Sequence, residues 1–238
     1  MTIALRKGAY VARMADGAED LQACQRLRHQ CFFGHAGVDA DRFDPLSQHV
    51  MVEDSAGRLV ATLRVALWSD GPAMLTGYAA QFYDLTRLAR VVGPFAELGR
   101  FCVAPSVLDP DVLRILWGAV TRLVDAEDIR YLIGCTSFPG VDPEAYGSTF
   151  TLLRSRHATP GDLGPGRKSS ETVPFTAVRT ARGSGQMPPL LRTYLAMGGW
   201  VSDHAVIDRD LQTLHVFTCV PVATIPAGRA KALRAVAG

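Results

Sequence analysis

A carboxylate and a guanidinium lie three residues apart within a short apolar run, Glu97-Leu98-Gly99-Arg100-Phe101-Cys102-Val103. The apolar flanks predict a mostly buried strand, in which a charge is costly unless it is paired or used. Strict strand alternation would send Glu97 and Arg100 to opposite faces. Gly99 lies between them, and a glycine inside a strand often marks a bulge that redirects side chains. The segment therefore predicts a bulged strand that lines a functional site.

The bulk properties describe a globular protein with an uneven charge. A chain of 238 residues can form one sizeable domain, and its net charge of +2 gives no global tendency to bind nucleic acid. Residues 151–195 contain seven basic and two acidic residues, whereas residues 37–54 are acidic. Such segments suggest partners of opposite charge, and solvated surface loops are an equally good interpretation.

The cysteines and the hydropathy indicate the cellular compartment in which the protein is expected. The spacing of the five cysteines fits neither a metal site nor a CxxC motif, so they read as reduced core residues of a cytoplasmic protein. We find no signal peptide and no apolar stretch of about 18 residues, so no membrane-spanning segment is expected.

Apolar periodicity and capping residues predict a mixture of strands and helices. The predicted strands are 10–14, 49–53, 59–68, 95–104, 131–135, 173–179 and 213–222. The predicted helices are 16–33, 76–91, 109–126, 143–156, 188–197 and 226–236. Residues 157–170 are rich in glycine, proline and polar groups and are expected to form an exposed loop. The order is neither a strict βαβ wind nor a sandwich, which indicates an α/β (α+β) fold.

Several charged residues lie at the ends of predicted elements or inside apolar runs. They are Arg28, Asp41, Asp44, Arg64, Glu97 and Arg100. Each of these residues, taken alone, could belong to a partly exposed ion pair. Together, three acids and three bases at such positions are typical of a coupled network around a site.

The charged pattern resembles two related families. Arg28-x-x-x-Phe32, Asp41-x-x-Asp44, Arg64 and Glu97-x-x-Arg100-Phe101 resemble the signature of acyl-homoserine-lactone synthases, although Phe33-Gly34-His35 lacks their tryptophan. Four further segments resemble the L-ornithine N(α)-acyltransferases, in a likeness that runs from about residue 13 to 234. They are Gln48 to Asp54, Ile133 to Gly140, Trp200 to His204, and Leu214 to Thr218.

The resemblance implies a GNAT acyltransferase fold, with a mixed, mostly antiparallel sheet in which strands 95–104 and 131–135 splay apart. Residues 1–180 would form the core, and residues 181–238 an extension of the same domain on the acceptor side. The implied reaction moves a 3-hydroxyacyl chain from acyl carrier protein to the α-amine of L-ornithine, giving a lyso-ornithine lipid. The donor would bring its own phosphopantetheine arm, with no other cofactor and no metal.

Amide formation from a thioester needs a neutral amine, so a carboxylate near the line of attack is the natural base. Glu97 is the candidate, and its alternative role is to hold Arg100 or Arg28 in place. Arg100 could orient Glu97 or bind the amino-acid carboxylate, for which Arg28 and Arg64 are alternatives. Tyr146 is a candidate acid for the leaving thiolate, or a packing residue.

Other residues are candidates for substrate contact. In this fold the amides of Phe101, Cys102 and Val103 would face the oxyanion of the tetrahedral intermediate. Asp41 and Asp44 could bind the δ-ammonium of ornithine, or cap their loop. Ser137 is a further candidate, as is His204 beside Asp203, which could equally be a capping or surface histidine.

The turn after the Glu97 strand argues against coenzyme A as the donor. This turn runs from Ala104 to Asp111 and contains no glycine. It contains two prolines, and its two aspartates would repel a diphosphate. An acidic carrier protein could instead dock on the basic segment, at Arg154, Arg156, Arg167 and Lys168. Leu116, Trp117 and Phe138 could line an acyl tunnel or belong to the core.

Two alternatives to an ornithine acyltransferase remain open. One is a signal synthase similar to the lactone synthases, and the other is an inactive GNAT-fold module that binds carrier protein or membrane. The basic tail with Arg229, Lys231 and Arg234 could give peripheral contact with the inner face of the membrane, or form a helix on the core.

Overall fold

The computed structural model describes residues 4–178 and 186–238, which form two compact units. The first unit comprises Met1–Leu67, Leu98–Ile129 and Ala227–Gly238, and the second comprises Trp68–Glu97 and Arg130–Pro226. The boundary predicted near residue 180 lies outside the described residues. The chain passes between the units four times, and one of these crossings lies directly after Glu97.

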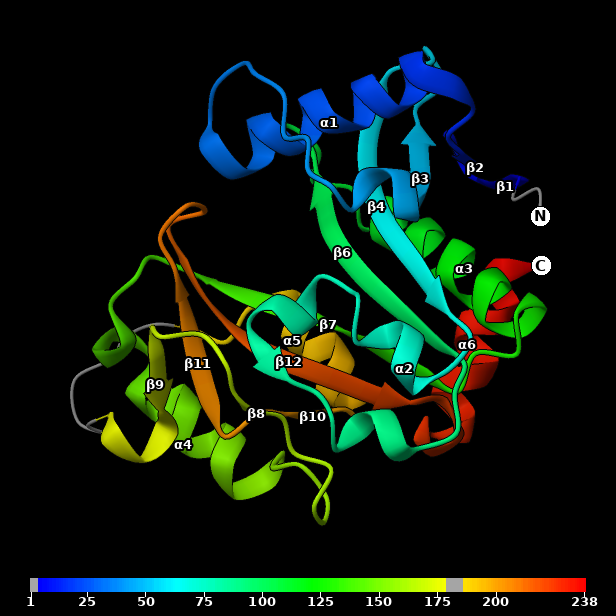
Figure 1. Cartoon of the computed structure of the whole chain (residues 1–238). Helices are drawn as coiled ribbons and strands as arrows, with labels where there is room; N and C mark the ends of the chain where they lie inside the picture. Colours follow the sequence, from blue (N-terminus) through cyan, green and yellow to red (C-terminus); the bar gives the residue numbers. More distant parts are fainter. Residues whose placement is uncertain (1–3, 179–185) are drawn as a thin grey trace. The chain divides into compact units, whose positions relative to one another are not determined.

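The first unit contains an antiparallel sheet whose strands follow the order β1-β2-β3-β4, with β6 next to β4. These strands are β1 (Ala4–Lys7), β2 (Tyr10–Met14), β3 (Gln48–Glu53), β4 (Leu59–Trp68) and β6 (Phe95–Val103). Helix α3 (Pro110–Ala126) packs on β1, β2 and β3, beside α6 (Ala227–Ala237) (Figure 1). Helix α1 (Gly17–Phe33) lies over β3.

Local signals explain why α3 starts where the sequence predicts. The Asp109 side chain accepts a hydrogen bond from the amide of Asp111 at 2.9 Å, and Pro110 occupies the first turn. At the C-terminus, Arg234 of α6 pairs with Asp125 of α3 at 2.7 Å. This contact favours the prediction of a terminal helix that packs on the core.

The second unit contains a sheet in the order β6-β7-β12-β11-β9. Strand β6 pairs in parallel with β7 (Tyr131–Pro139) from Phe95 to Glu97, and β12 (Thr213–Pro221) pairs antiparallel with β7 along its whole length. Strand β11 (His204–Asp208) lies next to β12, and β9 (Thr172–Pro174) lies next to β11. The short β10 (Trp200–Val201) also pairs with β12.

Alternating residues of β12 serve the two faces of this sheet. Leu214 and Val216 pack with α4 (Gly147–Arg156) and α5 (Pro189–Ala196) on one face. Phe217 and Cys219 pack on the other face, under residues 71–91. A strand buried on both sides in this way reads in sequence as a continuous apolar run, as predicted for residues 213–222.

The helix predicted over residues 76–91 is wrong. That segment folds as short pieces, namely the 3₁₀ helices Ala79–Gln81 and Leu88–Arg90 and the strand β5 (Tyr83–Asp84), and the short helix α2 (Gly71–Met74) precedes it. The amides of Tyr78 and Ala79 donate to the Glu97 carboxylate instead of to helix carbonyls. Strand β5 pairs with β8 (Gly166–Arg167), which lies within the predicted loop 157–170. Tertiary partners therefore override the helical pattern.

The strand predicted over residues 173–179, of which residue 179 lies outside the described residues, is also shorter than expected. Strand β9 covers Thr172–Pro174, and a 3₁₀ helix follows at Phe175–Ala177. Pro174 removes a backbone donor at the edge of the sheet, where a strand commonly ends.

Close packing at Gly71 generates a test of the second unit. A Cβ atom on Gly71 would lie 2.0 Å from the backbone oxygen of Ala89, whereas one on Gly228 would have no neighbour within 4 Å. We expect Gly71→Ala to lower the free energy of unfolding by about 1–3 kcal/mol through overpacking. Gly228→Ala, in an exposed helix, should not lower it. Urea denaturation compares the two variants, and equal midpoints would contradict the packing.

Candidate active site

A buried network of arginines and aspartates lies in the first unit. Arg28 on α1 has a side chain that is 0% exposed. Its Nε atom donates to Oδ2 of Asp39 at 2.8 Å, and its Nη1 atom donates to Oδ1 of Asp44 at 2.7 Å. Its Nη2 atom also donates to the backbone oxygen of Asp39 at 2.7 Å. The loop after α1 thus closes over the guanidinium.

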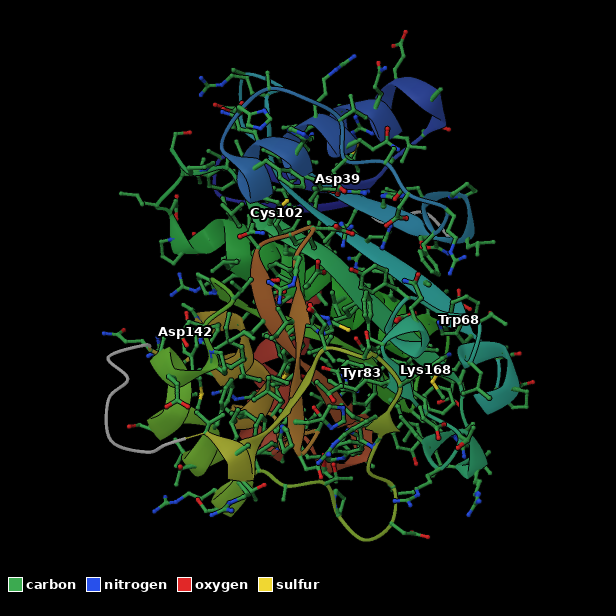
Figure 2. The ribbon with its side chains drawn as sticks, turned by 60° about the vertical axis from the view of Figure 1, so that its left-hand side comes forward. Asp39, Trp68, Tyr83, Cys102, Asp142 and Lys168 are labelled. Atoms are coloured by element: carbon green, nitrogen blue, oxygen red, sulfur yellow. The ribbon has the colours of Figure 1, made fainter. Side chains whose placement is uncertain are left out.

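Two further arginines enter the same network from β4 and β6. Nη1 of Arg64 donates to Oδ1 of Asp41 at 2.5 Å and to Oδ1 of Asp44 at 2.9 Å. Nε of Arg100 donates to Oδ2 of Asp39 at 2.8 Å. One oxygen of Asp39, which is labelled in Figure 2, therefore joins α1 to β6.

The ion pairs outweigh the cost of burial. Burial alone would raise the pKa of Asp44, but hydrogen bonds and charge from Arg28 hold that pKa well below its usual range. For Asp39, burial is likewise opposed by the charges of Arg100 and Arg28, and its pKa is lowered. Both carboxylates are therefore ionised at neutral pH, as a paired buried network requires.

The structure brings together five of the six charged residues that the sequence singled out: Arg28, Asp41, Asp44, Arg64 and Arg100. Asp39 is a member that the sequence reasoning missed. It lies in the acidic segment 37–54, but its spacing does not tell which carboxylates turn inward.

The special backbone conformation lies at Arg100 and not at Gly99, where it was expected. Arg100 has a φ of 52°, in the left-handed region that residues with a Cβ rarely adopt. Its side chain is held by Asp39 and Asp41, and its guanidinium lies 5.7 Å from the centre of the Phe32 ring. These contacts offset the local cost, and strain of this kind is common at functional sites.

Glu97 lies in the second unit and is 6% exposed. Its carboxylate accepts hydrogen bonds from the indole Nε1 of Trp68 at 3.2 Å, the amide of Tyr78 at 3.0 Å and the amide of Ala79 at 2.6 Å. Gly77 leaves it room, since a Cβ there would lie 2.3 Å from Oε2. These three donors belong to the second unit, whereas Asp39 and Asp41, which bind Arg100, belong to the first.

Tyr146 and Ser137, the other candidates from the sequence, lie outside the charged network. The Tyr146 hydroxyl donates to the backbone oxygen of Pro139 at 2.7 Å, and its ring packs on Phe138 in the core of the second unit. This arrangement favours its packing role. Ser137 on β7 is exposed, and it pairs with His215 of β12.

The predicted oxyanion and tunnel residues lie in two places. Phe101, Cys102 and Val103 follow Arg100 on β6, and the ring of Phe101 contacts that of Trp117 at 5.8 Å. Leu116 is fully buried in the first unit, and Phe138 is fully buried in the second. Their roles in binding an acyl chain stay predictions.

Arg154, Arg156, Arg167 and Lys168 are exposed on the second unit. Nζ of Lys168, labelled in Figure 2, donates to the backbone oxygen of Ala80 at 2.6 Å. Arg167 pairs with Tyr83 across β5 and β8. The basic segment is therefore attached to residues 80–84 at this point.

Among the described residues, no group of three or more histidine, cysteine, aspartate or glutamate side chains is placed to hold a metal ion. No described helix has the length and apolarity needed to cross a bilayer.

Comparison with known proteins identifies close relatives. A family model described as "Acetyltransferase (GNAT) domain" matches residues 24–118, which confirms the predicted fold class. An L-ornithine N(alpha)-acyltransferase from Rhodobacter capsulatus is 32% identical over 229 residues, which cover 87% of this chain and 88% of that protein. A protein of the same name from Brucella abortus is 30% identical over 244 residues, covering 92% of this chain and 87% of that protein.

Solved structures are more distant. FeeM, an N-acyl amino acid synthase from uncultured soil microbes, has a TM-score of 0.48 at 14% identity, over 90% of this chain and 91% of its own. The acyl-homoserine-lactone synthase LasI has a TM-score of 0.43 at 15% identity, over 88% and 89%. Both likenesses are too low to bear on function.

The lowered pKa values of Asp39 and Asp44 predict how stability depends on pH. Because both pKa values lie below those of the unfolded chain, their stabilisation is complete above the unfolded value of about 4 and is lost as the pH falls through the folded values. At pH 7 we expect Asp44→Asn to cost about 3–5 kcal/mol, because two buried arginines lose a charged partner. The cost should shrink at pH 3.

Urea denaturation at the two pH values measures this effect. Asp125→Asn, which breaks the exposed pair with Arg234, is the control and should change stability little at either pH. An equal cost for the two variants would contradict the buried network.

Proposed function

This chain belongs to the family of the L-ornithine N(alpha)-acyltransferases, and we propose that it transfers an acyl chain to the α-amine of L-ornithine. One observation carries the proposal: the similarity to these enzymes covers about nine-tenths of the chain, whereas the general acetyltransferase domain covers residues 24–118 only. The likeness thus spans both units.

Glu97 is the proposed base. The α-ammonium of ornithine must lose a proton before its nitrogen can attack a thioester, and a fixed carboxylate can accept that proton directly or through one water. Three N–H donors, from Trp68, Tyr78 and Ala79, keep the Glu97 carboxylate in one orientation. The same donors compensate for its burial.

The arginine–aspartate network in the first unit contains fully buried side chains and partly exposed ones. Arg28 and Asp44 are buried and serve to position the others. The Arg100 side chain is 10% exposed, and its guanidinium suits the carboxylate of an amino acid. The Asp41 side chain is 22% exposed and holds Arg64 and Arg100 in place.

The proposed donor is a 3-hydroxyacyl chain on acyl carrier protein, and the product is a lyso-ornithine lipid. The N-terminus of α3, where a coenzyme A diphosphate would be expected, is already capped by the Asp109 carboxylate and lacks the amide of Pro110. The exposed basic residues Arg154, Arg156 and Arg167 give the second unit a surface that suits an acidic carrier.

A comparison of donors tests the function. We expect purified protein to form N-acylornithine from 3-hydroxyhexadecanoyl–carrier protein at least about tenfold faster than from the matching coenzyme A ester, because the Asp109 carboxylate occupies the N-terminus of α3 and repels the diphosphate. Mass spectrometry of the products gives both rates. Efficient use of the coenzyme A ester would overturn the donor, and the absence of acylornithine with either donor would overturn the function.

Two substitutions test the role of Glu97. Glu97→Gln keeps the shape but cannot act as a base, and we expect turnover to fall by about 100-fold or more. Gly77→Ala should also lower turnover, because its Cβ atom displaces the carboxylate while leaving the glutamate in place. Steady-state kinetics over a range of pH measures both.

The control is Gly228→Ala, whose new Cβ meets no neighbour within 4 Å. Its turnover should match that of the unmodified protein. Normal turnover in Glu97→Gln, with an unchanged pH profile, would remove Glu97 as the base.

A further inference from the structure

Two buried histidines and a tyrosine form a polar cluster in the apolar core of the second unit. His204 of β11 is 0% exposed and His215 of β12 is 2% exposed. Their rings lie 5.2 Å and 5.6 Å from the ring of Tyr83, which is labelled in Figure 2. Val206 pairs with His215, so His204, two residues earlier, is its diagonal neighbour on the same face of the sheet.

The hydrogen bonds of Tyr83 fix the tautomer of His215. The single hydroxyl proton of Tyr83 goes to the backbone oxygen of His215 at 2.9 Å. The contact of 3.1 Å between that hydroxyl and Nδ1 of His215 must then have Nδ1–H as the donor. Burial lowers the pKa of His215 to about 4, so the ring is neutral at pH 7 and its Nε2 atom carries a lone pair.

The same reasoning applies to His204. Its Nδ1 atom lies 2.7 Å from Oδ1 of Asp203, and a carboxylate can only accept, so Nδ1 carries the proton. Burial lowers the pKa of His204 below its usual value, although Asp203 opposes this. The neutral ring again presents a lone pair on Nε2.

Neither Nε2 atom has a hydrogen-bond partner among the described residues. A buried acceptor left without a donor costs about 1–3 kcal/mol. A group that satisfies both atoms must supply at least two hydrogens. A hydroxyl supplies one, a water two and an ammonium three.

The cluster lies on the same face of the sheet as Glu97. Glu97 is aligned with Ile133 of β7, and Ile133 is aligned with Cys219 of β12, four residues from His215. The strand spacings put the Cα atoms of Glu97 and His215 roughly 16 Å apart. Ring contacts join the two places, since Phe82 lies 5.4 Å from Tyr78 and 4.9 Å from His215.

An extended ornithine fits this separation. Its two nitrogens lie roughly 6 Å apart. A hydrogen bond at each end brings the span to roughly 12 Å, and the side chains of Glu97 and His215 cover the remainder.

We propose that the Nε2 atoms of His204 and His215 bind the side-chain ammonium of the acceptor amino acid. The inference rests on the proposed function, with the α-amine at Glu97. Nδ1 of His204 donates to the Asp203 carboxylate, which increases the basicity of that ring, and the charge of this 75% exposed side chain is partly screened by water. The Arg167 guanidinium also acts on His204, but it is exposed and screened by water.

The test compares ornithine with 2-aminopentanoate, which has the same carbon chain and no terminal amine. In His204→Phe and His215→Phe we expect KM for ornithine to rise by at least about tenfold, with KM for 2-aminopentanoate unchanged, because only ornithine loses a partner. His215→Gln keeps an acceptor near the Nε2 position and should restore much of the preference. Phe217→Leu alters packing in the same core, and it should leave the ratio of the two KM values unchanged.

A second measurement uses the unmodified protein and does not depend on variants that fold. In nitrogen NMR of the histidine rings, ornithine should shift the Nε2 signals of His204 and His215, and 2-aminopentanoate should not.

Acyl transfer to ornithine with unchanged discrimination and unmoved Nε2 signals would overturn the inference, because the side-chain ammonium then binds elsewhere. That result would leave the proposed function intact. Failure of the protein to acylate any amine would instead overturn the function itself.

Discussion

The guanidinium of Arg28 has no exposed surface. The arrangement of the first unit depends on the carboxylates that pair with this buried cation. A buried cation of this kind is stable only with charged partners in good geometry. Asp39 and Asp44 supply them from the loop after α1, and the same carboxylates receive Arg64 from β4 and Arg100 from β6. One helix, one loop and two strands are thereby held around a set of charges that balance.

The second unit follows the same principle with the opposite sign. Glu97 is a buried anion, and it takes its donors from Trp68 and from the amides of Tyr78 and Ala79. The segment that provides those amides cannot be a regular helix there. It therefore runs over the sheet in short pieces and covers the face that contains His215 and Phe217, against which Tyr83 packs. A single strand charge thus shapes the layer over the proposed acceptor site.

Features set by neighbouring residues were predictable from the sequence, and those set by distant partners were not. The strands β3 and β4 and the start of α3 depend on local apolar patterns and capping residues, and they were predicted. The path of residues 76–91 depends on Glu97, and the choice of Asp39 depends on which carboxylate turns toward Arg28. The left-handed residue is Arg100 rather than Gly99, because the arginine side chain is anchored at its far end. Sequence spacing carries none of that information.

The central claim is that acyl transfer reaches the α-nitrogen of ornithine. The most direct measurement uses ornithine labelled with heavy nitrogen at the α position, incubated with the purified protein and a 3-hydroxyacyl–carrier protein. Tandem mass spectrometry then locates the acyl group. The account predicts a product in which the labelled nitrogen forms the amide. Acylation of the unlabelled terminal nitrogen, or no acylornithine at all, would contradict it.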